Sequence, residues 1–162
     1  MKKNQLLTGF FALSLLMNAW MASLFLRPVS VARADVTPSG DDLASYMANL
    51  QRDTHKLGLS IQAKNKPLAE FYVTELGEMF EIIQKKFPQY EGLQIAALSK
   101  AMIDPAKPAL SKALAASDWP GATTAYDKYL AACNGCHQAV QHPFVKLVAP
   151  TGNPFNQSFA TK

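Results

Sequence analysis

A helical repeat of apolar side chains constrains the fold of this chain most strongly. Over residues 41–64 the steps between successive core positions alternate between four and three residues, which keeps those positions on one helix face and is typical of a helix packed in a bundle. The positions are Leu43, Met47, Leu50, Thr54, Leu57 and Ile61. We therefore predict a first helix that is capped by Asp41 or Asp42 and buries one face.

Proline residues divide the chain into further helical segments. Pro67 suits the first turn of a second helix that continues to about Phe87, where Pro88 follows. A third helical region over 91–116 is interrupted by Asp104-Pro105, so we expect it to be kinked or in two pieces. The pattern is helical throughout, and it predicts an all-α fold.

The last helix and the segment after it differ in character. We predict a helix over residues 122–140. Residues 143–162 lose the helical period and contain three prolines, yet they keep a set of apolar side chains: Phe144, Val145, Leu147, Phe155 and Phe159. Because free tails are typically polar, we expect this segment to be an ordered, irregular C-terminal wrap over the helices.

The first residues are typical of an export signal. Two lysines precede an apolar run, Leu6–Leu26, and Ala32-Arg33-Ala34 offers a cleavage site. We expect residues 1–34 to be a cleaved signal peptide that leaves residues 35–162 as one domain. The apolar run is long enough to span a bilayer, so an uncleaved N-terminal anchor, with membrane contact only in that case, is the alternative.

The excess of basic charge lies in this N-terminal segment. Residues 1–34 hold four of the sixteen Lys and Arg side chains and none of the twelve Asp and Glu side chains. Subtracting the four leaves twelve charges of each sign, a formal net charge of zero. This balance argues against nucleic acid as a partner.

The only two cysteines stand in the segment Cys133-Asn134-Gly135-Cys136-His137. On a helix the spacing places two thiols and an imidazole on one face. Cys-x-x-Cys-His is the attachment pattern of a c-type haem, in which the thiols form thioethers and the imidazole binds the iron. We predict one covalent haem c held by Cys133 and Cys136, with His137 as the proximal axial iron ligand.

Two other interpretations of the motif are open. A redox-active Cys-x-x-Cys pair normally lies in a βαβ unit, and the chain has no such pattern. Half of a zinc site needs a second pair of ligands, which His55 and His142 do not supply at suitable spacing. Haem attachment in bacteria takes place outside the cytoplasm, so the export signal agrees with the haem interpretation and predicts a location in the periplasm.

Helices that end in Cys-x-x-Cys-His resemble the class II cytochromes c, the cytochrome c-prime family with its low-spin relatives. The resemblance covers about residues 41–140 and is specific at the haem motif. It implies an antiparallel four-helix bundle in which the last helix binds the haem. The segment Asp42-Leu43, followed by Met47 and Leu50, resembles the start of the low-spin members, in which the methionine reaches the iron.

The second axial ligand decides between functions. Met47 lies on the core stripe, and a thioether ligand raises the reduction potential of haem iron. Packing in the core is the commoner role of such a methionine. His55, one position off the stripe, and an iron without a second protein ligand are the alternatives.

The leading prediction is a single-electron carrier that exchanges electrons with an unidentified redox protein. A five-coordinate haem protein that binds NO or CO is the alternative. A peroxidase-like enzyme needs a distal acid–base residue, for which only Arg52 and His55 are near, and no catalytic constellation is present. We therefore do not expect an enzyme, and homodimer formation stays open.

Overall fold

The structure, a computed structural model, describes residues 41–161, and this part is all-helical. It contains α2 (Leu43–Gln62), α3 (Lys66–Lys86), α4 (Ile95–Ile103), a short 3-10 helix η1 (Asp104–Ala106), α5 (Lys107–Ala115) and α6 (Trp119–Ala139). The all-α prediction is confirmed for these residues, and their arrangement is compatible with a helical bundle. The expected signal peptide, residues 1–34, lies outside them.

Side-chain caps and prolines set where the long helices begin. The Asp42 carboxylate accepts a hydrogen bond from the Ser45 amide at 2.7 Å, and the Asn65 side chain accepts one from the Leu68 amide at 3.3 Å. The last helix begins at Trp119, three residues before the predicted start. Pro120 fits its first turn, where no amide donor is needed, and Asp118 caps it.

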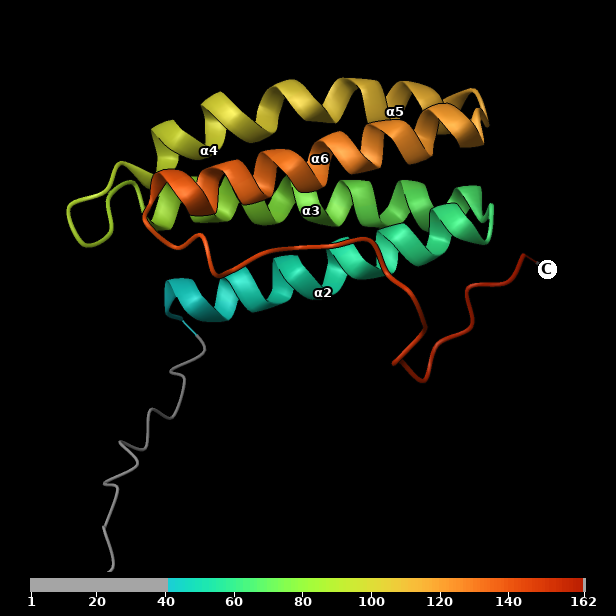
Figure 1. Ribbon diagram of the computed structural model, residues 1–162, viewed down its shortest axis with the longest axis horizontal. Helices are drawn as coiled ribbons and strands as arrows, with labels where there is room; N and C mark the ends of the chain where they lie inside the picture. The colour runs from blue at the N-terminus through green and yellow to red at the C-terminus, as the bar shows by residue number, and fades with distance from the viewer. Residues whose placement is uncertain (1–40, 162) are drawn as a thin grey trace, which may run out of the picture. The chain divides into compact units, whose positions relative to one another are not determined.

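The third helical region begins later than predicted and is broken at the expected place. Tyr90 and Leu93 exchange backbone hydrogen bonds around Glu91 and Gly92, which both have positive φ angles, so α4 begins only at Ile95. At the other end, Pro105 lies in η1 between α4 and α5. The two short helices continue one another as a single broken row (Figure 1).

The helices pack side by side around a shared core (Figure 1). Helix α2 packs against α3 and α6, and the row of α4 and α5 packs against both α3 and α6. Side chains from all of these helices are almost completely buried, among them Leu57, Ile83, Ile103, Leu110, Leu114 and Tyr129. Burying each large apolar side chain contributes about 1.5–3 kcal/mol, which makes this core the main source of stability.

The segment after α6, which we call the C-terminal strap (residues 142–161), is irregular and returns along the helices (Figure 1). Polar side chains of α2 and of the α2–α3 turn hold its backbone. Gln62 Nε2 donates to the Pro150 carbonyl at 2.8 Å, and Asn65 Nδ2 donates to the Phe159 carbonyl at 3.1 Å. Pro150 and Phe159 are themselves buried. The strap is thus part of the packed structure.

Within residues 41–161 no helix combines the length and the apolar character that a membrane crossing requires. The apolar run Leu6–Leu26 is not among these residues.

Candidate functional site

The Cys-x-x-Cys-His motif occupies the last turns of α6, so it lies on the last helix as predicted. Both cysteines are free thiols. Cys133 is buried, and Cys136 is half-buried. Burial raises the pKa of the Cys133 thiol to about 12 and also raises the pKa of Cys136. Both sulfurs are therefore protonated at neutral pH in this folded state, and burial further shields Cys133.

The imidazole of His137 has one nitrogen engaged with the strap. Its Nδ1 lies 2.9 Å from the carbonyl oxygen of Val145. A carbonyl can only accept, so Nδ1 carries the proton and Nε2 keeps the free lone pair that a metal binds. Burial lowers the pKa of His137, although the Val145 carbonyl acts in the opposite direction. The neutral imidazole is the form that coordinates metals.

Asn134, inside the motif, fixes the strap next to this imidazole. Its Nδ2 donates to the Leu147 carbonyl at 2.9 Å, and its Oδ1 accepts from the Leu147 amide at 2.7 Å. Gly135 has a different role, because a Cβ atom there would lie 2.9 Å from the Met102 terminal methyl of α4. The two variable positions of the motif thus contact the strap and α4.

The sequence did not indicate a role at the motif for Asn134, and it indicated only apolar packing for Val145. Asn134 occupies a position at which the motif accepts any residue, and Val145 contributes a backbone carbonyl, which has no signature in the sequence. A side-chain amide inside the motif, followed by an apolar segment that must pack, was the only available signal.

Three further residues considered from the sequence are placed on α2. Met47 is half-buried and packs against the core. The Nε2–H group of His55 donates to the Gly152 carbonyl at 3.2 Å, and its ring packs edge-on against Phe155. The guanidinium of Arg52 is paired with the neighbouring Asp53 at 2.8 Å. His55 and Arg52 thus have hydrogen-bond or ion-pair partners in the strap and on α2, whereas Met47 packs against the hydrophobic core.

The two tyrosines that precede the motif differ in hydrogen bonding. The Tyr126 hydroxyl donates to the Thr54 carbonyl at 2.9 Å, which joins α6 to α2. The Tyr129 hydroxyl is buried and has no hydrogen-bond partner among the described residues. Burial raises the pKa of both groups.

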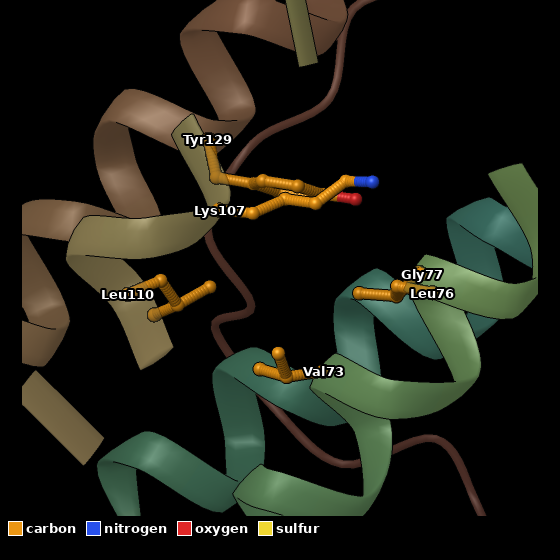
Figure 2. A pocket seen from close by; sticks show the side chains of 6 residues that line it. All are labelled: Val73, Leu76, Gly77, Lys107, Leu110 and Tyr129. Carbon is orange, nitrogen blue, oxygen red and sulfur yellow. The ribbon is translucent and has the colours of Figure 1, made fainter. Parts of the chain in front are cut away.

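The Tyr129 side chain borders a small pocket between α3, α5 and α6, where it extends alongside Lys107 (Figure 2). Leu76 and Leu110 are among the apolar side chains that complete its wall. The space available to the centre of a water molecule is about 10 Å³, which is at the lower limit for holding one water. No motif residue lines this pocket.

Metal-binding groups are sparse in residues 41–161: no three His, Cys, Asp or Glu side chains gather there as a set that could hold an ion. His142, the first residue of the strap, donates from Nδ1 to the carbonyl of Val140, the C-cap residue of α6, at 2.7 Å. Comparisons of the chain with protein-family models, with curated proteins and with solved structures give no match.

Proposed function

We propose that this protein is an exported c-type cytochrome that carries one covalent haem c and transfers single electrons. The observation that carries the proposal is the state of the motif: two free thiols and one imidazole share the last turns of α6, and a backbone carbonyl orients the imidazole. This donor set fits haem c, which needs two thiols for thioether bonds and one neutral imidazole for iron.

Each motif residue has a defined task in this proposal. Cys133 and Cys136 would hold the group covalently, and His137 Nε2 would be the proximal ligand. The Val145 carbonyl keeps the proton on Nδ1 and so keeps Nε2 available. The bound haem supplies a one-electron Fe(III)/Fe(II) couple. The helices bury Cys133, while Cys136 and His137 are half-buried.

We further propose an antiparallel four-helix bundle with Met47 as the second axial ligand. The colour gradient in Figure 1 runs in opposite directions along α2 and α6, which supports this topology. The Tyr126–Thr54 hydrogen bond marks one point at which the two helices meet. Cys133 follows Tyr126 by seven residues and Met47 precedes Thr54 by seven, so antiparallel helices bring both to the same level, about 10 Å from that point.

The hydrogen bond made by His55 favours Met47 over His55 as the second ligand of the iron. The imidazole Nε2 of His55 is already used in a hydrogen bond to the strap, and coordinating iron through that nitrogen would break this bond. Met47 loses no hydrogen bond by turning toward a metal. The partner in the proposed reaction is a redox protein in the periplasm.

Absorption spectra test the proposal on protein produced in a bacterium that attaches c-type haem. We expect the purified chain to have the mass of residues 35–162 plus one haem, and the haem to stay bound in denaturant. Reduced bands should be sharp and unchanged by CO, because His137 and Met47 would both hold the iron and leave no position for CO. A chain without covalent haem would contradict the cytochrome assignment.

Two matched variants identify the second ligand. Met47→Leu keeps the apolar volume and removes the sulfur, so we expect a reduced spectrum that is broad and shifts with CO. His55→Gln serves as the control and should leave the spectrum unchanged. CO binding by the parent protein would contradict electron transfer through a six-coordinate iron and favour the binding of NO or CO.

A further inference from the structure

We propose that the C-terminal strap is a positioning element for the His137 imidazole, and that Asn134 is the residue that holds it in place. The inference rests on the proposed function, because it concerns how the chain orients the imidazole that would bind iron. It assigns a role to a segment and to a motif position that haem attachment itself does not require.

The strap reaches His137 through a short turn tied to the end of α6. The His142 amide donates to the His137 carbonyl at 2.7 Å, and the Val145 amide donates to the His142 carbonyl at 3.0 Å. These two hydrogen bonds set the direction in which the chain leaves the helix. As a result the Val145 carbonyl comes within 2.9 Å of Nδ1.

Asn134 fixes the strap on the C-terminal side of Val145. It bonds both the amide and the carbonyl of Leu147, two residues further along the strap, and so acts as a neighbouring strand would. Asn134 lies one turn before His137 on α6. A single helix face therefore carries the imidazole and the amide that holds its hydrogen-bond acceptor.

We call the two hydrogen bonds between Asn134 and the Leu147 backbone the Asn134 clamp. The contacts further along the strap do not replace this clamp. Gln62 holds Pro150, His55 holds Gly152 and Asn65 holds Phe159, all beyond Leu147. They keep the end of the strap against α2 and the α2–α3 turn. Val145 itself is partly exposed, so side-chain burial does little to hold its backbone. The position of its carbonyl depends mainly on the turn after α6 and on Asn134.

The expected consequence is a lower reduction potential than the imidazole would give alone. A carbonyl that accepts the Nδ1 proton makes the opposite nitrogen a stronger donor. A stronger donor stabilises the oxidised iron more than the reduced iron. Releasing the strap should therefore raise the potential, and it should also let the imidazole rotate.

Two variants release the clamp by different routes. Asn134→Leu keeps a side chain of similar size and removes both hydrogen bonds. Leu147→Pro leaves the motif unchanged and removes the amide that Asn134 Oδ1 accepts from. Leu147→Ala is the control, because it shortens the same side chain and keeps that amide. Gln62→Leu is a second control that loosens the strap only near Pro150.

Each haem-bearing variant is measured by redox titration and by hydrogen exchange of the strap amides. We expect Asn134→Leu and Leu147→Pro to raise the potential and to speed amide exchange around Val145, while both controls keep the parent potential. If Asn134→Leu fails to acquire haem, Leu147→Pro decides the question.

The outcomes separate this inference from the proposed function. A parent protein purified without covalent haem contradicts the proposed function. A haem-bearing parent whose potential is the same in Asn134→Leu and Leu147→Pro overturns the positioning role alone. The positioning role is also overturned if Leu147→Ala raises the potential as much as Leu147→Pro, since side-chain packing would then account for the effect.

Discussion

Tyr126 and Tyr129 show that the surroundings of a buried hydroxyl group decide whether it stabilises the fold. Both precede the motif on α6, and both are buried. Their hydroxyls nevertheless differ, because only Tyr126 reaches a backbone carbonyl on α2. A buried hydroxyl without a partner costs free energy, whereas a bonded one contributes to stability.

The two tyrosines therefore predict opposite results for the same substitution. Tyr126→Phe should lower the free energy of unfolding by about 1 kcal/mol, since it removes a buried hydrogen bond. Tyr129→Phe should leave the free energy of unfolding unchanged or raise it. Urea unfolding of the purified variants measures both. An equal loss in the two would mean that the Tyr129 hydroxyl has a partner such as a bound water.

At the scale of elements, the contact between α2 and the strap explains why glycine occupies position 58, inside a helix. Gly58 lies inside α2, where glycine weakens a helix relative to alanine. The sequence correctly indicated that the helix continues through it. The reason lies in packing, because a Cβ atom there would be 2.6 Å from the Tyr126 hydroxyl oxygen and 2.7 Å from Pro150.

We predict that Gly58→Ala destabilises the protein although alanine is the better helix former. Pro150 and Tyr126 would have to move, which would loosen the strap from α2. Gly77→Ala on α3 is the matched control, because its Cβ atom would meet nothing within 4 Å. It should stabilise the protein by up to about 1 kcal/mol. Thermal unfolding of both variants should show a lower melting temperature for Gly58→Ala and a higher one for Gly77→Ala than for the parent protein.

At the scale of the whole described part, the packing of the helices covers one of the two motif thiols and leaves the other half-buried. Cys133 faces the core between α6 and its neighbours and is only 7% exposed, whereas Cys136 is half-buried. A thiol in this position cannot be reached by a bulky reagent unless the helices separate. If the chain carries haem c as proposed, attachment at Cys133 has to precede the closure of the helices.

The burial of the thiols gives a pH-dependent prediction for protein made without haem attachment. Iodoacetamide reacts with thiolates, so alkylation of Cys133 should be much slower than that of Cys136 at pH 8. The raised pKa of Cys133, about 12, means that its rate should keep increasing with pH far above the ordinary thiol range. Peptide mass spectrometry measures each rate. Equal rates in the folded protein would contradict the burial of Cys133.

The sequence by itself determined the helical segments, the broken third region and the placement of the motif on the last helix. Each follows from local physics: apolar spacing, the geometry of proline and the capping preferences of Asp and Asn. The starts of α4 and α6 were displaced by a few residues, because a turn with positive φ angles and a proline in a first turn are hard to distinguish from loops.

Only the tertiary structure decided which partners the site residues have. His137 meets the Val145 carbonyl, His55 meets the Gly152 carbonyl and Asn134 meets the Leu147 backbone. All three acceptors are main-chain atoms of an irregular segment, and every residue type offers the same atoms. Their positions follow from how the strap packs against α2 and α6, so no pattern of side chains along the chain encodes them directly.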